Sequence, residues 1–366
     1  MLITKIEVYK YSIPMVPFTI ATGTMYFAQN IFIKIYTNEN IMGVGECSAF
    51  PMIAGETQNT CFELAKDFSE IWIGKNPLDI EARINELHLM IAGNYTAKSA
   101  FDLALYDIAS KYENKPLYEF LGGTQKEIES DLTIGIDTPE NMATTATEFI
   151  KNGVNMIKVK LGKNAKEDVE RIKKIREAVG EKIILRIDAN QGWSYNDAVF
   201  ALTEIGKYNI QFCEQPMRKH NDYLLPQLCQ LSPVKIMADE SVFTHYDAEN
   251  IIRNNAAAYI NIKFAKSGGI HEALKINAVA QQNNIPCMMG GMLESRVALT
   301  AKVHFAMAKQ NIQFYDLDTC LLGHKIDPVI GGVKYNGMKL LLDETPGIGA
   351  TVKDDFLNTL TKITIQ

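Results

Sequence analysis

The hydrophobic pattern of the chain changes near residue 125. Beyond that point, short apolar runs alternate with longer segments in which apolar residues recur every three or four positions, as in an amphipathic helix. Successive runs begin about 25 residues apart, the length of one strand followed by one helix. The expected strands lie in LTIGI (132–136), MIKVKLG (156–162), IILRIDAN (183–190), IQFCEQP (210–216), KIMADES (235–241), YINIKFAKSGG (259–269), PCMMGG (286–291) and QFYDLD (313–318).

This repeat predicts an α/β protein with parallel strands, because a helix between two strands returns the chain to the same end of the sheet. Eight such units suffice to close a (β/α)8-type barrel, which needs about 200 to 250 residues. The alternative is an open, doubly wound sheet. We favour the barrel, because the units are regular and no GxGxxG dinucleotide fingerprint follows the first strand.

Residues 1–125 follow a different pattern. Two alternating runs, ITKIEVYKYSI and NIFIKIYT, precede a series of helical segments, and strands followed by helices predict a small α+β domain. We expect the barrel over residues 126–325. The remaining segment, 326–366, contains turns and short strand-like pieces that do not continue the repeat, and we expect it to pack back on the N-terminal domain.

Composition and charge exclude several classes of function. The 366-residue chain is 47% hydrophobic and has a net charge of −6, without a block of Lys and Arg that would bind nucleic acid. It has no run of about 18 apolar residues to cross a membrane. The N-terminus alternates like a strand, unlike a signal peptide, and the six cysteines show neither CxxC nor disulfide-framework spacing. We therefore expect a cytoplasmic protein with reduced thiols.

The strand expected in MIKVKLG carries two lysines on one face. Its Ile, Val and Leu residues suit the face that packs against helices, so Lys158 and Lys160 point into the barrel near the C-terminal end of the strand. Buried ammonium groups are costly unless anions neutralise them. We therefore expect the neighbouring strands to supply carboxylates.

The next strands carry such carboxylates at their ends. Asp188, Glu214 and Asp239 each end a strand at an inward-facing position, and Lys263 ends the strand after them. Barrels of this kind carry out chemistry at the carboxyl ends of their strands. A single carboxylate at such a place is more often a turn residue or a helix cap, but turns do not explain an ordered series on consecutive strands.

Three carboxylates from three neighbouring strands, with no Cys or His among them, predict a site for a hard cation such as Mg²⁺. Water or substrate oxygens would fill the remaining positions around the metal. None of the six histidines falls at a strand end, which argues against a catalytic zinc site. Lys160 and Lys263 would then flank the metal from opposite sides of the barrel.

With these residues in place, the sequence resembles the enolase superfamily and, within it, the muconate-lactonizing subgroup. The matched positions are a Lys-x-Lys motif, three metal-binding carboxylates and a lysine on the sixth strand, which here are Lys158, Lys160, Asp188, Glu214, Asp239 and Lys263. Lys266 competes for the last role, but Lys263 lies closer to the strand and matches the family spacing. The resemblance covers nearly the whole chain and implies a modified (β/α)7β barrel with a capping domain.

The last strand distinguishes between the reactions of this subgroup. Asp316 and Asp318 resemble the Asp-x-Asp motif by which dipeptide epimerases hold the α-ammonium group of the substrate. Two carboxylates that face one ammonium group also disfavour N-acylated or purely anionic substrates. The resemblance therefore implies an isomerase, a Mg²⁺-dependent dipeptide epimerase that acts at the α-carbon of the C-terminal residue.

The resemblance also implies residues that contact the dipeptide. Thr133 on the first strand matches a substrate-lining position, and we expect the turn around Gly291 and Met292 to line the same pocket.

Specificity is expected to depend on the first loop of the capping domain, residues 16–30, which reads VPFTIATGTMYFAQN. Family members that act on Ala-Glu often carry a basic residue there to meet the Glu side chain. This segment has no Lys or Arg; Gly23 and Thr24 stand where one would be sought, and residues such as Phe18 make it apolar. We therefore expect dipeptides with a hydrophobic second residue.

In the implied reaction, Lys160 and Lys263 exchange the α-proton from opposite faces through an enediolate, with the substrate carboxylate on Mg²⁺. One lysine must be neutral, and the neighbouring charge of Lys158 would lower the pKa of Lys160. The expected partner is a small-molecule dipeptide, with neither nucleic acid nor membrane, and the family resemblance allows a homo-oligomer. The alternatives are an N-succinylamino acid racemase or o-succinylbenzoate synthase, a metal-dependent aldolase or hydrolase, and a non-catalytic peptide-binding barrel.

Overall fold

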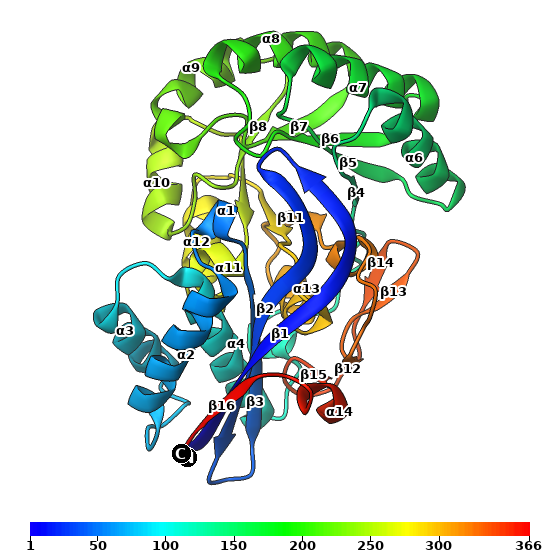
Figure 1. The fold of residues 1–366 in the computed structure, drawn as a ribbon. Helices are drawn as coiled ribbons and strands as arrows, with labels where there is room; N and C mark the ends of the chain where they lie inside the picture. The colour runs from blue at the N-terminus through cyan, green and yellow to red at the C-terminus, as the bar shows by residue number, and fades with distance from the viewer.

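The computed structural model describes residues 1–366 and contains a barrel-like sheet of eight parallel strands (Figure 1). The strands follow one another around the sheet in chain order from β4 to β11. Each segment in which a strand was predicted overlaps one, and only the last strand begins outside its segment, one residue earlier. Their bounds are β4 (Leu132–Ile134), β5 (Met156–Lys160), β6 (Ile184–Asp188), β7 (Ile210–Glu214), β8 (Ile236–Ala238), β9 (Tyr259–Ile262), β10 (Cys287–Gly290) and β11 (Ile312–Asp316).

The first and last of these strands meet without a regular ladder. The Asp131 N–H donates to the Tyr315 carbonyl at 3.3 Å, and the Leu317 N–H donates to Ser130 Oγ at 2.8 Å. These bonds join the segment before β4 to the end of β11, so the sheet is nearly closed. The prediction of a barrel in place of an open sheet is confirmed.

Helices surround the strands, and polar caps mark where most of the longer ones begin. The helices between the strands are α6 (Pro139–Lys151), α7 (Ala165–Val179), α8 (Tyr195–Ile205), α9 (Leu225–Leu231), α10 (His245–Arg253), α11 (Phe264–Ser267), α12 (Ile270–Gln282) and α13 (Arg296–Ala308). A Ser, Thr or Asn side chain accepts a hydrogen bond from the first turn of five of them, at Thr138, Asn164, Ser194, Thr244 and Ser295. These caps fix the direction in which the chain leaves each strand end.

The N-terminal part forms an antiparallel sheet covered by helices on one face. The sheet has the order β16-β1-β2-β3, with β1 (Ile3–Ile20), β2 (Gly23–Thr37), β3 (Met42–Ala49) and β16 (Lys362–Ile365). Its helices are α1 (Pro51–Ala54), α2 (Gln58–Trp72), α3 (Ile80–Met90), α4 (Tyr95–Tyr112) and α5 (Leu117–Phe120). Trp72 and Phe101 pack edge to face at 5.1 Å between α2 and α4, within a core of their own.

Residues 16–30, expected to be a loop, instead form the end of a long β-hairpin. β1 continues to Ile20 and β2 starts at Gly23, so that Ala21 and Thr22 alone make the turn. The alternating apolar and β-branched residues on both sides of the turn favour strand over loop. The Ile136 N–H donates to the Thr19 carbonyl at 2.9 Å, and the blue hairpin in Figure 1 reaches over the barrel strands.

The C-terminal segment returns to the N-terminal sheet. It contains β12 (Val329–Gly331), β13 (Lys334–Asn336), β14 (Lys339–Leu341), β15 (Ala350–Val352) and α14 (Asp354–Leu357) before β16. β16 pairs with β1, where Ile365 lies opposite Ile6. The division into a capping domain (1–125), a barrel (126–325) and a C-terminal segment (326–366) stays a prediction, which this pairing supports.

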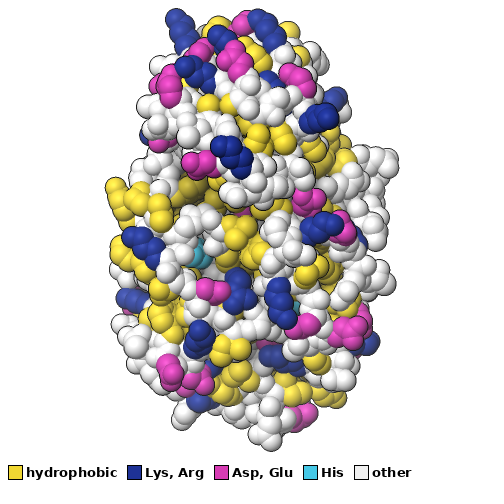
Figure 2. Space-filling view, turned by 90° about the vertical axis from the view of Figure 1, so that its right-hand side faces the viewer, with side chains coloured by type: hydrophobic (Ala, Val, Ile, Leu, Met, Phe, Trp, Pro, Cys, Tyr) yellow, Lys and Arg dark blue, Asp and Glu magenta, His cyan; other side chains and the backbone are white.

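The surface carries both signs of charge. On the face shown in Figure 2, Lys and Arg side chains are interspersed with Asp and Glu, and neither sign gathers into one region. No helix combines the length and the apolar character that a membrane span requires.

Candidate active site

The carboxyl ends of β5 to β9 bring together the polar residues predicted for the site. Lys158 and Lys160 lie on β5, the carboxylates end β6 and β7 or follow β8, and a lysine follows β9. The parallel register places Lys160 opposite Asp188, which in turn lies opposite Glu214. All the side chains are buried, and they comprise Lys158, Lys160, Asp188, Glu214, Asp239 and Lys263.

Ion pairs link the lysines of β5 to the nearest carboxylates. Lys160 Nζ donates to Asp188 Oδ2 at 2.6 Å, and Lys158 Nζ lies 2.7 Å from Glu214 Oε2. Burial lowers the pKa of Lys158, but the carboxylates of Asp316, Glu214 and Asp188 raise it more, so the pKa lies well above that of an ordinary lysine. Lys158 is therefore held as a positive charge among these carboxylates.

Lys263 and Lys266 occupy different environments, although both approach Asp239. Lys263 Nζ lies 2.7 Å from Asp239 Oδ2 and 3.8 Å from Glu214 Oε1. Lys266 Nζ donates to the carbonyl oxygens of Asp239, Val242 and Asn261, and it lies 2.5 Å from Asp239 Oδ1. The structure therefore commits Lys266 to holding the backbone behind the site, whereas Lys263 remains available to a substrate.

The three carboxylates fit a divalent cation. Glu214 Oε2 and both oxygens of Asp239 are buried and accept no well-oriented hydrogen bond. Burial and the charge of Asp188 raise the pKa of Glu214 to about 8, which shows that these acids repel one another. Burial acts in the same direction on Asp239, but Lys263 and Lys266 hold its pKa well below the usual range. Hard oxygen donors under mutual repulsion are the ligands that Mg²⁺ prefers.

The aspartates of the last strand lie beside this site. Lys158 Nζ donates to Asp316 Oδ2 at 2.7 Å, and the Thr133 N–H donates to Asp318 Oδ2 at 2.7 Å. Burial, followed by the charges of Asp316 and Asp131, raises the pKa of Asp318 well above that of an ordinary aspartic acid. Thr133 therefore positions Asp318 through its backbone, and Asp316 connects the two aspartates to Lys158.

Asp131 joins these two aspartates and was not among the predicted residues. One carboxylate oxygen from each of Asp131, Asp316 and Asp318 lies within 4.8 Å of the others. Asp131 also pairs with Arg186 at 2.8 Å. Sequence reasoning passed over Asp131 because it precedes the first strand, where a polar residue is ordinarily structural. Its position two residues before Thr133 is in phase with the inward face and could have indicated it.

A small cavity between the hairpin and the barrel contains both proposed bases. Lys160 and Lys263 line it together with Asn190, the wall 291–293, and apolar side chains from the N-terminal part. The apolar side chains are those of Phe18, Ile20, Met25, Phe50 and Ile53, and the wall consists of Gly291, Met292 and Leu293. Three of the predicted contact residues, Phe18, Gly291 and Met292, therefore line the cavity, whereas Thr133, Asp316 and Asp318 do not. The cavity has no Lys or Arg other than Lys160 and Lys263.

Gly23 and Thr24 do not line this cavity, in contrast to the prediction. Side chains alternate along a hairpin, so Phe18 and its cross-strand partner Met25 face inward while Thr24 is exposed. Thr24 Oγ1 lies 2.9 Å from Thr19 Oγ1 on the outer face. The same alternation, applied to a hairpin instead of a loop, would have identified Ile20 and Met25.

The N-terminal sheet holds the cavity wall in place. Glu46 on β3 accepts hydrogen bonds from the N–H groups of Ser295 and Ala298, at 2.8 and 2.9 Å, and from Asn30 Nδ2 at 2.7 Å. Ser48 Oγ accepts a hydrogen bond from the Leu293 N–H at 3.2 Å. The wall is therefore pre-formed by contacts that run between the two parts of the chain.

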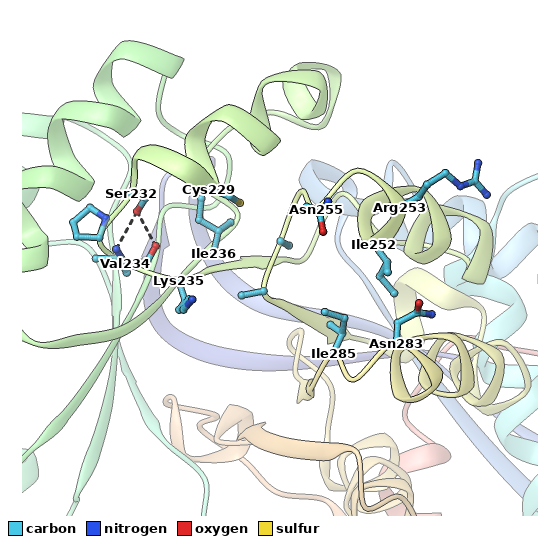
Figure 3. A pocket seen from close by; sticks show the side chains of 13 residues that line it. Cys229, Ser232, Val234, Lys235, Ile236, Ile252, Arg253, Asn255, Asn283 and Ile285 are labelled. Carbon is cyan, nitrogen blue, oxygen red and sulfur yellow. Dashed lines mark hydrogen bonds between the residues drawn. The ribbon is translucent and has the colours of Figure 1, made fainter.

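A larger hollow lies at the opposite end of the barrel (Figure 3). Its lining precedes β8, β9 and β10, as at Ser232, Ala258 and Ile285, whereas the predicted site follows the carboxyl ends of strands. It contains Lys235 and Arg253 but no carboxylate. The chemically equipped site is therefore the smaller cavity under the hairpin.

Comparison with known proteins identifies the family. Residues 3–122 match the mandelate racemase / muconate lactonizing enzyme N-terminal domain, and residues 141–356 match the enolase C-terminal domain-like model. A D-Ala-D/L-Ala epimerase of Cytophaga hutchinsonii is 43% identical, with all of both chains covered. A hydrophobic dipeptide epimerase of Enterococcus faecalis is 40% identical, covering 91% of this chain and 94% of that one. An L-Ala-D/L-Glu epimerase of Clostridium acetobutylicum is 37% identical, covering 95% and 98%.

Solved structures show the same architecture. The dipeptide epimerase of C. hutchinsonii, crystallised with Mg and D-Ala-L-Val, superposes with a TM-score of 0.98 at 42% identity over all of both chains. The dipeptide epimerase of E. faecalis, crystallised with Mg and L-Leu-L-Tyr, superposes with a TM-score of 0.93 at 38% identity, covering 96% of this chain and all of that one. The matches to both domains and over the full length show that this chain belongs to the mandelate racemase / muconate lactonizing enzyme family of the enolase superfamily.

Proposed function

We propose that this protein is a Mg²⁺-dependent dipeptide epimerase that inverts the α-carbon of the C-terminal residue. The observation that carries the proposal is that Lys160 and Lys263 line one cavity while each pairs with a carboxylate of the predicted metal site, Asp188 or Asp239. Binding alone does not require two lysines that face a common space. The arrangement therefore favours proton transfer over a non-catalytic peptide-binding role.

The substrate would lie with its carboxylate toward Asp188, Glu214 and Asp239, the residues that would hold the cation. When bound, Mg²⁺ supplies the positive charge that stabilises the negative charge developed on the substrate carboxylate during deprotonation. Lys158, fixed as a cation by its carboxylate neighbours, adds a second positive charge at the same side. The buried position of these groups strengthens their electrostatic effect, because little water screens them.

Lys160 and Lys263 would carry out the proton transfers. In its neutral form, one lysine accepts the α-proton at Nζ, and the other, in its ammonium form, donates a proton from its own Nζ to the opposite face of the same carbon. The configuration inverts because removal and return take place on different faces. In the reverse direction the two lysines exchange roles, so either configuration of the substrate is accepted.

Asp316 and Asp318 would bind the free α-ammonium group of the dipeptide. Both are buried, and an ammonium group would make charge-assisted hydrogen bonds to their carboxylates. An N-succinylamino acid has a methylene group and a further carboxylate in place of that ammonium group, which these residues disfavour. The site therefore supports a dipeptide epimerase over an N-succinylamino acid racemase or an o-succinylbenzoate synthase.

The second residue of the preferred dipeptide is proposed to be hydrophobic. The hairpin and β3 present Phe18, Ile20, Met25 and Phe50 to the cavity, and no basic side chain approaches from the hairpin to pair with a Glu. Two of the relatives fit this view, since one is a hydrophobic dipeptide epimerase and one acts on D-Ala-D/L-Ala. The third is an L-Ala-D/L-Glu epimerase, so a substrate comparison is the deciding experiment.

As part of the proposal, the partner is a small-molecule dipeptide, with no nucleic acid or membrane, and the enzyme works in the cytoplasm. The interspersed charges in Figure 2 and the six free cysteines support this view. Assembly into a homo-oligomer stays a prediction.

The test is deuterium incorporation. The protein is incubated with Mg²⁺ and pooled L-Ala-L-Xaa dipeptides in D₂O, and mass gain is measured by mass spectrometry with an EDTA control. Metal-dependent gain on Ala-Leu, Ala-Val or Ala-Phe with little gain on Ala-Glu is the expected result. Gain chiefly on Ala-Glu would retain the reaction and overturn the specificity. No gain on any dipeptide would overturn the proposed function.

A further inference from the structure

Asp131 and Arg186 form a buried ion pair that the proposed reaction does not use. Asp131 Oδ2 accepts a hydrogen bond from Arg186 Nη1 at 2.8 Å, and neither side chain is more than 4% exposed. Arg186 Nε donates to Gln211 Oε1 at 2.7 Å, and its guanidinium lies 5.3 and 5.5 Å from the ring centroids of Phe212 and Phe314. Contacts on several sides therefore hold this pair in a fixed position inside the barrel.

The Asp131 carboxylate stands next to the predicted ammonium-binding residues with one oxygen free. Asp131 Oδ1 is buried and has no hydrogen-bond partner, and one oxygen from each of Asp131, Asp316 and Asp318 lies within 4.8 Å of the others. A buried carboxylate oxygen without a partner is unfavourable. Arg186 pairs with Asp131, and Lys158 is shared by Asp316, Asp188 and Glu214, whereas Asp318 pairs with no Lys or Arg.

The repulsion within this cluster agrees with these pairings. Burial and the charge of Asp316 raise the pKa of Asp131 to about 6, even though Arg186 acts in the opposite direction. A group with one positive charge and several N–H donors would reduce the repulsion and donate a hydrogen bond to the unpaired oxygen of Asp131. A primary ammonium group has that chemistry, since it offers three donors.

We infer that Asp131 is the third carboxylate of the ammonium-binding cluster and makes the enzyme specific for substrates with a free N-terminal amine. This inference rests on the proposed function and deepens it. Asp131 is already paired with Arg186, so it acts on the ammonium group through Asp316 and Asp318, as a positioning residue. A substrate without an ammonium group does not interact with the charge of this cluster, so Asp131 should selectively affect substrates that carry one.

The test compares two substrates of nearly the same shape. L-Ala-L-Leu carries the amine, and N-propionyl-L-leucine carries hydrogen in its place. Exchange of the α-proton in D₂O with Mg²⁺ gives kcat and KM for both. For Asp131→Asn, KM for L-Ala-L-Leu is expected to rise about 10- to 100-fold, the range for losing one interaction with a charged group, while kcat changes by less than about threefold. The constants for N-propionyl-L-leucine are expected to stay unchanged.

Asp137→Asn is the matched control. Asp137 follows β4, the strand that Asp131 precedes, and the Asp137 side chain is exposed. The substitution removes one negative charge, as Asp131→Asn does. This variant should keep the wild-type ratio of kcat/KM between the two substrates. If Asp131→Asn does not fold because Arg186 is left unpaired, the double variant Asp131→Asn with Arg186→Gln is measured in its place. Removing both charges of a buried pair destabilises a protein less than leaving one charge unpaired.

The outcomes separate this inference from the proposed function. A selective loss on L-Ala-L-Leu supports the inference. Equal losses on both substrates, or an unchanged ratio, would overturn it and leave the epimerase proposal standing. Absence of exchange with either substrate in the wild-type protein would overturn the proposed function and this inference together.

Discussion

Replacing Lys266 and Lys263 in turn should separate a structural lysine from a catalytic one. Lys266 Nζ donates to three backbone carbonyls and pairs with Asp239, and its side chain is 1% exposed. Lys266→Met would leave those carbonyls and part of the Asp239 charge buried without a partner. Breaking a buried ion pair in this way costs about 3 to 5 kcal/mol, a large part of a typical folding stability of about 5 to 15 kcal/mol.

Lys263→Met should have the opposite profile. Asp239 keeps Lys266 and the proposed cation as partners, and no backbone carbonyl loses a donor, so this variant should lose less stability than Lys266→Met. Its exchange activity should fall by about 100- to 10,000-fold, the usual contribution of one acid–base group. Urea unfolding in saturating Mg²⁺ and D₂O exchange on L-Ala-L-Leu measure the two quantities.

The comparison can refute the reasoning in two ways. If Lys266→Met unfolds at the same urea concentration as the wild-type protein, the carbonyl contacts of Lys266 do not support the fold. If Lys263→Met retains full exchange while Lys266→Met, still folded, has none, the catalytic assignment belongs to Lys266.

Three further predictions concern specificity, metal binding and pH. Met25→Arg places a cation in the apolar cavity, where it can pair with the side chain of a Glu. The ratio of kcat/KM for L-Ala-L-Glu to that for L-Ala-L-Leu should therefore rise at least about tenfold, the equivalent of one charge-assisted hydrogen bond. An unchanged ratio would show that the hairpin does not contact the second residue of the dipeptide. Mg²⁺ at about 100 times its Kd should raise the unfolding free energy of the wild-type protein by about 2.7 kcal/mol in thermal unfolding. Asp239→Asn should abolish this stabilisation by Mg²⁺. Equal stabilisation of both proteins would place the metal elsewhere. Burial lowers the pKa of His304 from 6.5 to about 4. As the pH falls from 6.5 to about 4, the unfolded chain therefore takes up a proton at this residue before the folded protein does. The free energy of unfolding should fall over this range by about 3 kcal/mol in all. His304→Gln should flatten that dependence in urea unfolding between pH 7 and pH 4.5, and identical slopes would contradict it.

The strand ends were predictable because they depend on local patterns. Lys160 lies opposite Asp188, which lies opposite Glu214 on the next strand. Each of the three can be identified from the alternation of apolar and polar residues in its own strand and from the spacing between strands. Once parallel strands are inferred, their carboxyl ends must meet, so the cluster follows without any knowledge of longer-range contacts.

The parts that escaped prediction depend on contacts between distant segments. Asp131 meets Asp318 across the seam of the barrel, and no local pattern links two residues so far apart in the chain. Glu46 reaches Ser295 between the N-terminal sheet and the barrel in the same way. The position of Thr24 outside the cavity was missed for a different reason, because a hairpin was treated as a loop and its alternation was therefore not applied.

The central claim is that Lys160 and Lys263 act on the same α-carbon from opposite faces. It is tested most directly by giving Lys160→Ala and Lys263→Ala each diastereomer, L-Ala-L-Leu and L-Ala-D-Leu, in D₂O with Mg²⁺. Both variants should fail to interconvert the diastereomers, and any remaining exchange should be confined to one diastereomer in one variant and to the other diastereomer in the second. Full epimerisation by either variant, with its metal-dependent stability intact, would contradict the two-lysine mechanism.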